Sequence, residues 1–340
     1  MKISLKEMAK RLNLSTAAVS KALNDYPDIS LATKKLVKSY AKKVGYKANS
    51  QASFLRSQKS KTIGVIIPDI TNPFFAKILK AIMNKAYKND YSVILGNSKE
   101  SYSLEVKLVN QFLQQKVDGI LMSLANDTSQ YTHLENILAD ETVLVLFDKV
   151  AKLINCSKVI VDDKDGGFKA TEHLIKKGCT KIAHFRGDLN PQNSIDRYLG
   201  YREALSVNKI SFDPNKVLVT SSGSIEQGYI LAKKLFESGI EIDGLFCITD
   251  MVALGAMTFF KEQKIDIPNE ISVIGFSNTM FGNLVHPSLS TIDQKASKIG
   301  AEAMRIFLSE EKMLKTENRL ENQSLVLKTT LIKRESTQRM

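Results

Sequence analysis

Basic side chains crowd the start of this chain of 340 residues. Residues 1–61 contain 14 lysines and arginines against three acidic residues, so they carry +11 of the chain's net charge of +12. Ammonium and guanidinium groups gathered in this way bind phosphate oxygens, and salt weakens that binding because each contact releases counterions. The remaining residues are close to neutral. The charge distribution therefore indicates a front segment that meets a polyanion and a body with a different task.

Three short helices are predicted to position these basic residues. Ser4 and Glu7 have the spacing of a capping box, which starts a first helix. After a turn, Ser15 caps a second helix with apolar residues on one face, and a third helix extends over about 30–44 until Gly45 stops it. Two short helices around a tight turn, with a third behind them, are typical of a helix-turn-helix unit, whose second helix enters the major groove of DNA.

The second helix carries the residues that would face the bases. Its polar and small positions opposite the apolar face are Thr16, Ala17, Ser20 and Lys21. Of these, Lys21 alone can make a strong contact, either with guanine O6 and N7 or with a phosphate. The alternative is a small basic three-helix unit whose lysines are solvated.

The run LSTAAVSKALN at 14–24 resembles the DNA-reading helix of the LacI/GalR family of bacterial transcription regulators, and GYKAN at 45–49 resembles that family's passage from head to hinge. The resemblance implies contacts with bases or phosphates from Ser4, Ser15, Thr16, Ala17, Ser20, Lys21, Asn24, Ser30, Thr33, Tyr46 and Asn49. Two positions depart from the family pattern: Ala18 stands where threonine is commoner, and Lys21 stands where arginine is commoner. Lysine keeps the charge but lacks the bidentate guanidinium fork, so base discrimination there is weakened.

The segment 49–60 is predicted to be the hinge or linker. Its core, 49–57, is too short for a stable isolated helix, and on its own it reads as a flexible tether. The resemblance implies instead a hinge helix that forms when two copies meet in the minor groove. There Leu55 would wedge between base steps and Ala52 would allow close approach. Ser53 replaces an arginine often seen in this hinge, which removes one backbone contact.

From residue 61 the pattern changes to apolar runs alternating with amphipathic helices. Strands are predicted at 62–67, 91–95, 117–122, 143–147, 157–161, 181–185, 216–219, 244–248 and 271–276. Helices are predicted at 73–89, 101–115, 128–139, 165–177, 194–208, 224–238 and 250–263. Apolar strands that alternate with helices form parallel sheets covered on both faces. A second series, starting at 157–161, predicts two similar doubly wound lobes.

The family resemblance extends over this body, which is similar to periplasmic sugar-binding proteins. It is carried, in matching order and spacing, by 67–75, 117–120, 170–175, 249–256, 271–276 and 334–336. The implied architecture is an all-α helix-turn-helix DNA-binding domain followed by α/β, two doubly wound parallel-sheet lobes of periplasmic sugar-binding-protein type. Its implied divisions are a head at 1–48, a hinge at 49–60 and a two-lobed effector-binding and dimerisation domain at 61–340.

A small effector is expected between the lobes, beyond the carboxyl ends of the strands. The resemblance implies contacts from Asp69, Asn72, Phe74, Asp148, Arg197, Asp250 and Phe281, and the strand ends add Phe276. Carboxylates and a guanidinium form fixed hydrogen bonds to hydroxyls, and aromatic faces stack on a sugar ring, so the set favours a sugar.

Several of these assignments have alternatives. Asp69 could instead cap the helix that starts near Pro73, and the phenylalanines could belong to the core. Thr249 stands where asparagine is frequent, and Ser277-Asn278 replaces a frequent Asp-Asp pair, which changes the hydroxyls that are read. A purine or another metabolite is the alternative effector.

The sequence offers little for an enzyme. It contains no G-x-S-x-G elbow, P-loop or G-x-G-x-x-G motif, and its four histidines are scattered, with His173 on a predicted helix as a structural residue. Three cysteines far apart show neither metal spacing nor a disulfide framework, so no metal or cofactor is expected. An enzyme on the same two-lobed scaffold is kept only as a rival interpretation.

The expected protein is a cytoplasmic transcription regulator, most consistent with a repressor. No apolar run is long enough for a membrane span, and the start of the chain has no apolar core typical of a signal peptide. One head reads half a site, so a homodimer on a pseudo-palindromic double-stranded DNA operator is expected, with a small effector, a sugar, controlling affinity. The rival is a cytoplasmic sugar-binding module without DNA function.

Overall fold

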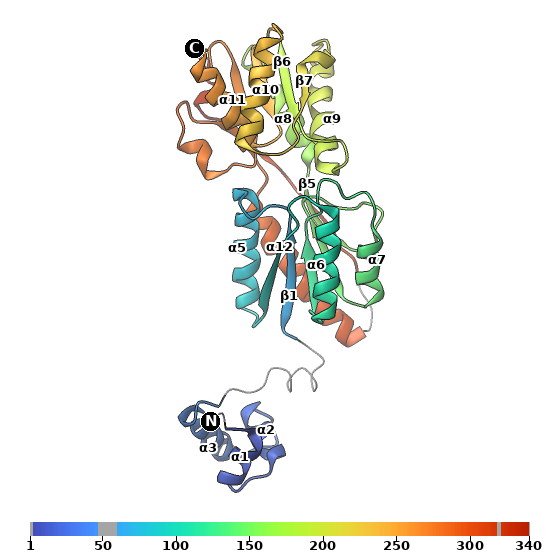
Figure 1. Cartoon of the computed structure of the whole chain (residues 1–340), viewed down its shortest axis with the longest axis vertical. Helices are drawn as coiled ribbons and strands as arrows, with labels where there is room; N and C mark the ends of the chain where they lie inside the picture. Colours follow the sequence, from blue (N-terminus) through green and yellow to red (C-terminus); the bar gives the residue numbers. More distant parts are fainter. Residues whose placement is uncertain (1–2, 47–59, 318–320, 340) are drawn as a thin grey trace. The chain divides into compact units, whose positions relative to one another are not determined.

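The computed structural model describes residues 3–46, 60–317 and 321–339 (Figure 1). The chain divides into two compact units, Met1–Ser60 and Lys61–Met340. Within the described ranges, no helix is both long enough and apolar enough to cross a bilayer.

The first unit has the three predicted helices. They are α1 (Leu5–Arg11), α2 (Thr16–Leu23) and α3 (Leu31–Lys43). Each helix starts at a serine whose side chain accepts a hydrogen bond from a backbone N–H of the first turn: Ser4, Ser15 and Ser30. The capping box is complete, since the Glu7 carboxylate also accepts from the Ser4 amide. These caps satisfy amides that have no partner inside the helix, which is why such short segments begin where they do.

The second unit has two six-stranded sheets, each the centre of one lobe (Figure 1). The first sheet has the order β11-β5-β4-β3-β1-β2 and is parallel throughout. Its strands are β1 (Thr62–Ile67), β2 (Ser92–Asn97), β3 (Gly119–Met122), β4 (Val143–Phe147), β5 (Ser157–Val161) and β11 (Ser324–Leu327). Its helices are α5 (Pro73–Tyr87), α6 (Tyr102–Gln114), α7 (Thr132–Ala139) and α12 (Ala296–Glu317).

The second sheet has the order β12-β10-β9-β8-β6-β7, and only its edge strand β12 runs antiparallel. Its strands are β6 (Ile182–Arg186), β7 (Val217–Val219), β8 (Gly244–Cys247), β9 (Ser272–Phe276), β10 (Ser290–Asp293) and β12 (Thr330–Ile332). Its helices are α8 (Asp163–Lys176), α9 (Gln192–Val207), α10 (Ile225–Glu237) and α11 (Asp250–Glu262), with short 3-10 turns at Pro214–Lys216, Met280–Asn283 and Glu335–Thr337.

Helices cover both faces of each sheet, as the apolar strands predict. In β1, Ile63, Val65 and Ile67 face the core under α5 and α12, whereas Ile66 faces the core under α6 and α7. In the second lobe, α10 and α11 cover one face and α8 and α9 the other. Burial on both faces fixes the strands and therefore the loops at their carboxyl ends.

The predicted division between the two lobes is wrong by one strand. The strand at 157–161 is β5, which pairs with β4 and β11 in the first sheet, and the second lobe begins with α8. The sequence also did not predict β10, α12, β11 or β12. The chain passes between lobes after β5, after β10 and after β11. An apolar parallel strand fits either sheet equally well, so only its pairing decides which lobe it joins.

Candidate functional site

A cavity of about 460 Å³ lies between the two lobes of the second unit. Loops that follow β1, β2, β3 and β4 line it from the first lobe, and loops that follow β6, β7, β8 and β9 line it from the second. The carboxyl ends of parallel strands present loop residues and helix N-termini, which explains why polar groups gather there.

Several non-glycine residues around this cavity adopt left-handed backbone conformations. Glu100 has φ of 56°, Asp148 has φ of 59° and Ser277 has φ of 117°. Such conformations cost free energy in residues with a Cβ atom and persist only where surrounding contacts hold them. The sharp turns after the strands therefore fix the directions in which these side chains point.

Five of the eight residues predicted to contact an effector line this cavity. They are Asp69, Asn72, Phe74, Asp148 and Arg197. The Asn72 side chain also caps α5 by accepting from the Phe74 amide at 3.0 Å, so the cap is Asn72 rather than Asp69. Asp69 Oδ1 accepts from the amide and the hydroxyl of Thr71 at 2.8 and 2.7 Å, which shapes the turn into the helix.

Asp250 does not line the cavity, contrary to its predicted position. Its carboxylate is fully buried and accepts from the Thr279 amide at 2.6 Å and from the Thr291 hydroxyl at 2.5 Å. Burial raises the pKa of Asp250, while these hydrogen bonds lower it. Asp250 thus ties the start of α11 to the loop after β9 and to β10, and both of its oxygens accept hydrogen bonds inside the lobe.

Phe276 and Phe281 also lie outside the cavity lining. Phe276 is fully buried in the core of the second lobe, and the guanidinium carbon of Arg197 lies 3.9 Å from its ring centroid. The ring therefore supports Arg197 from beneath. Phe281 lies in the 3-10 turn Met280–Asn283 with 38% of its surface exposed.

Arg197 is held in place by the crossover between the lobes. Its Nε donates to Asp163 Oδ1 at 2.8 Å, and one terminal nitrogen donates to the Ile248 carbonyl at 2.9 Å. Burial raises the pKa of Asp163 to about 7, even though the nearby Arg197 charge lowers it. Burial likewise raises the pKa of Asp148, against the lowering charges of Arg197 and Lys149. Sequence reasoning missed Asp163, because an aspartate at a helix start looks like an ordinary cap.

Lys149 is a second buried cation that sequence reasoning missed. Its ammonium donates to both oxygens of Glu100 at 2.7 and 2.6 Å and to Asn126 Oδ1 at 2.7 Å. The Asn126 amide in turn donates to Glu100 at 2.8 Å. A lysine directly after an aspartate at a strand end carries no local signal for this role.

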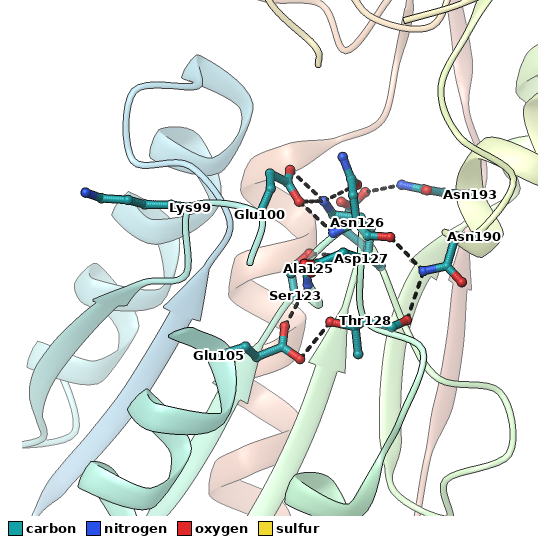
Figure 2. A network of polar contacts seen from close by, with 12 residues as sticks. Lys99, Glu100, Glu105, Ser123, Ala125, Asn126, Asp127, Thr128, Asn190 and Asn193 are labelled. Carbon is teal, nitrogen blue, oxygen red and sulfur yellow. Dashed lines mark hydrogen bonds and ion pairs between the residues drawn. The ribbon is translucent and has the colours of Figure 1, made fainter. Parts of the chain in front are cut away.

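The loop that carries Asn126 is anchored by a buried carboxylate and bridged to the second lobe. Glu105 accepts from the Ala125 amide at 2.6 Å and from the Thr128 hydroxyl at 3.0 Å, and it lies 2.8 Å from His133 Nε2. Asn190, from the second lobe, donates to the carbonyls of Asn126 and Thr128 at 2.6 and 3.0 Å (Figure 2). The loop is therefore anchored to its own lobe by Glu105 and to the second lobe by Asn190.

Two buried polar atoms in the cavity lining lack a hydrogen-bond partner among the described residues. They are Ser194 Oγ, on the first turn of α9, and Gln294 Nε2, just after β10. Gln294 uses its oxygen to accept from Ser277 at 2.7 Å. Buried polar groups nearly always find a partner, so these two atoms mark an unmet hydrogen-bonding demand at the cavity wall.

In the first unit, most of the predicted DNA-contacting residues have exposed side chains. Exposed are Ser4, Ser15, Thr16, Ala17, Lys21, Asn24 and Ser30, whereas Thr33 and Tyr46 are half-buried. Lys21 pairs with Asp28 on the surface. Asn24 donates to the Ser20 carbonyl at 2.7 Å.

Ser20 departs from its predicted position. It is 7% exposed and lies beside the core residues Val19 and Ala22, so its side chain does not face outward from α2. Asn49, Ala52 and Leu55 lie outside the described residues. Within the described ranges, no group of three or more His, Cys, Asp or Glu residues is placed to hold a metal ion.

Residues 60–334 match the family described as periplasmic binding proteins and sugar binding domain of LacI family. The chain is 31% identical to the HTH-type transcriptional regulator RegA of Clostridium saccharobutylicum, over 99% of this chain and all of that protein. That alignment includes the head as well as the body.

Solved structures agree with this assignment. The transcription regulator CcpA of Lactococcus lactis is 30% identical, with a TM-score of 0.73 over 82% of this chain and 99% of that one. The lac repressor dimer bound to operator is similar in fold, with a TM-score of 0.87 over 99% of both chains at 22% identity. The LacI family is a family of transcription regulators and not of enzymes. The chain thus belongs to the LacI family of DNA-binding transcription regulators, with a helical head and a two-lobed body like that of periplasmic binding proteins.

Proposed function

We propose that this protein is a repressor that binds a pseudo-palindromic operator as a homodimer. A sugar bound in the cavity between the lobes would lower or raise its affinity for the operator. The observation that carries the proposal is the pairing of a basic helix-turn-helix unit with a polar cavity of about 460 Å³. Its DNA partner also implies action in the cytoplasm.

The exposed face of α2 supports sequence-specific DNA binding. Thr16, Ala17 and Lys21 lie on the exposed side of the helix that would enter the major groove. Asn24 extends this face by one turn. We propose that these residues read the operator, while the serine-capped helix starts at Ser15 and Ser30 present amides to phosphates.

The cavity chemistry supports a sugar. Carboxylates at Asp69 and Asp148 and the orphan atoms of Ser194 and Gln294 can each pair with a hydroxyl. The aromatic residues in the described lining are Phe74 and Phe75, whose rings meet edge to face at 5.2 Å. That pair offers no parallel slot for a flat purine, which favours a saturated ring with many hydroxyls.

Dimerisation through the body is supported by large apolar side chains on the outside of both lobes. In the first lobe, Met83 and Tyr87 on α5 are exposed, and in the second lobe, Met280 and Leu284 are exposed. Apolar patches of this kind are typical of protein interfaces. Two bodies joined along both lobes would convert a change in lobe position into a change in head spacing, with a coupling of about 1–3 kcal/mol.

The proposal can be tested with the full-length protein. Selection from random duplexes should yield a pseudo-palindromic site, and binding to it should fall steeply with salt. A thermal-shift screen of sugars and nucleobases should find a stabilising ligand, and that ligand should change operator affinity. Equal, weak binding to every duplex at physiological ionic strength, with or without ligands, would contradict the proposal.

A further inference from the structure

The two basic side chains at the cavity are already paired with carboxylates. Among the described lining residues, the basic side chains are Lys149 and Arg197. An anionic group on a ligand, such as a phosphate or a carboxylate, would need at least one of them. Their existing partners therefore decide which charge of ligand the cavity accepts.

Every N–H donor of the Lys149 ammonium already has an acceptor in the protein. An ammonium has three N–H donors. All three acceptors around it are protein atoms, the two Glu100 oxygens at 2.7 and 2.6 Å and Asn126 Oδ1 at 2.7 Å. The Lys149 side chain is 8% exposed, so water cannot easily replace these partners.

Arg197 already has a carboxylate partner as well. Asp163 accepts from its Nε at 2.8 Å, the Phe276 ring covers one face, and the Asp148 charge is close enough to be sensed by it. Its remaining N–H groups can donate to neutral hydroxyls. A second anion beside this pair would meet two buried carboxylates.

Acidic groups outnumber basic groups in the lining, where Asp69, Glu100, Asp148, Asp188 and Glu226 oppose the two cations. Helix N-termini at the cavity favour anions in principle, because their first amides lack partners. Here Asn72, Ser224 and Thr249 each accept from one first-turn amide of α5, α10 and α11, which leaves fewer amides for an anion. Helix α9 has no such cap. The side-chain amide of Asn193, in its first turn, donates to Asp148 Oδ1 at 3.4 Å, so a carboxyl group already lies at that helix start.

The backbone at Glu100 is held in a costly conformation that keeps the carboxylate on Lys149. Lys99 and Glu100 are consecutive left-handed residues, with φ of 51° and 56°. The Asn126 amide donates to the same carboxylate at 2.8 Å (Figure 2). Strain of this kind persists where surrounding contacts require it, and the contacts here include the Glu100 amide on the Pro68 carbonyl at 3.2 Å as well as the ion pair with Lys149.

We infer that Glu100 makes the cavity selective for uncharged ligands by neutralising Lys149 and occupying, together with Asn126, its three donors, so that the effector is an unphosphorylated polyol and its phosphorylated or carboxylated forms are rejected. The identity of the ligand as a polyol rests on the proposed function. The exclusion of anions rests on the paired charges alone.

The first experiment uses matched ligands on the wild-type full-length protein. Calorimetry compares ribose with ribose 5-phosphate, glucose with glucose 6-phosphate and galactose with galacturonate. Each anionic sugar is also tested as a competitor of a bound neutral sugar, because the basic head attracts phosphates independently. We expect every anionic form to bind at least about tenfold more weakly than its neutral partner, since like charges at a site repel. Tighter binding of any anionic form overturns the inference.

The second experiment changes the specificity. Glu100→Gln removes the charge that holds Lys149 but keeps an acceptor for the Asn126 amide, and it should raise affinity for inorganic phosphate and sugar phosphates at least about tenfold. Glu203→Gln is the matched control, because it frees Lys164, its partner at 2.7 Å, on the outer surface with the same change in charge. The head is identical in both variants, so phosphate bound there cancels in the comparison.

The outcomes of the two experiments separate the two proposals. A folded Glu100→Gln protein that gains no phosphate affinity over Glu203→Gln overturns the role of Glu100. If Glu100→Gln does not fold, the wild-type ligand pairs still decide whether anions are excluded. If nucleobases bind and no sugar does, the sugar proposal fails, while the phosphate comparison continues to test the exclusion of anions.

Discussion

The guanidinium of Arg197 lies 3.9 Å from the ring centroid of Phe276, so a residue expected to contact the effector instead supports one that does line the cavity. Arg197 comes from α9 and Phe276 from the end of β9. With the carboxylate of Asp163 at 2.8 Å, the ring fixes the direction of the guanidinium before any ligand arrives. Such preorganisation lowers the ordering cost of binding.

Arg197→Ala should abolish the response to effector and also destabilise the body. Removing one partner of a buried ion pair leaves an uncompensated charge, here on Asp163, at a cost of about 3–5 kcal/mol. Chemical denaturation measures the loss, and a double variant with Asp163→Asn should recover part of it. Arg305→Ala, at an exposed pair with Glu302, is the control and should change stability little. Retained effector response in a folded Arg197→Ala protein would show that the ligand binds elsewhere.

Asp250→Ala should act on stability rather than through a lost ligand contact. The change leaves the Thr279 amide and the Thr291 hydroxyl without their buried acceptor, at a cost of about 1–3 kcal/mol. The midpoint of urea unfolding should fall. Ligand affinity per folded molecule, measured by calorimetry well below that midpoint, should be affected less than by Arg197→Ala. The reverse order would place Asp250 in the binding site.

Glu310 should make the folded state more stable at mildly acid pH. Its carboxyl is buried on α12 against the Ser157 hydroxyl, and burial raises its pKa to about 7. Between the ordinary carboxyl range and pH 7 the folded chain binds a proton that the unfolded chain has lost. This contribution therefore falls as pH rises through that window.

The comparison of wild type with Glu310→Gln isolates this effect. The amide keeps an acceptor for Ser157 but does not titrate, so the variant should gain stability over wild type as pH rises from about 5 to about 8. Burial lowers the pKa values of His173 and His184 to about 4 and about 3, so these histidines make the folded state more stable as pH rises. Their contribution is the same in both proteins, so it cancels when the free energy of unfolding of one is subtracted from that of the other. Parallel stability curves for the two proteins would refute the assignment.

Lys21→Ala should weaken binding to the selected operator roughly tenfold to a hundredfold if the ammonium reads a base. The loss should be smaller on random duplexes, and it should not be copied by Lys261→Ala on the body. Gel-shift titrations at several salt concentrations measure the affinity of each variant for the operator and for random duplexes. Equal loss on every sequence would assign Lys21 to a phosphate instead.

Asp28→Asn should increase binding to all duplexes, because the surface pair with Lys21 is broken.

Local features of the sequence were sufficient for most of the elements, though not for β10, α12, β11 and β12, and for the place of the site. The caps at Ser4 and Ser15 predicted the first two head helices, since a cap and its first turn involve residues only three apart, and the third was predicted from near Ser30 to its stop at Gly45. Alternating apolar strands and helices predicted parallel sheets, and the rule for strand ends predicted the position of the cavity. Asp69, Asn72, Phe74, Asp148 and Arg197 line it.

The tertiary structure alone decided what joins distant parts of the chain. The bond between Arg197 and Asp163 spans 34 positions and that between Lys149 and Glu100 spans 49, so no local pattern records them. The placement of β5 in the first sheet and the inward turn of Asp250 depend on which neighbours arrive in space. Caps and periodicity are short-range properties that a sequence displays directly, whereas charge pairing across a cavity depends on the packing of both lobes.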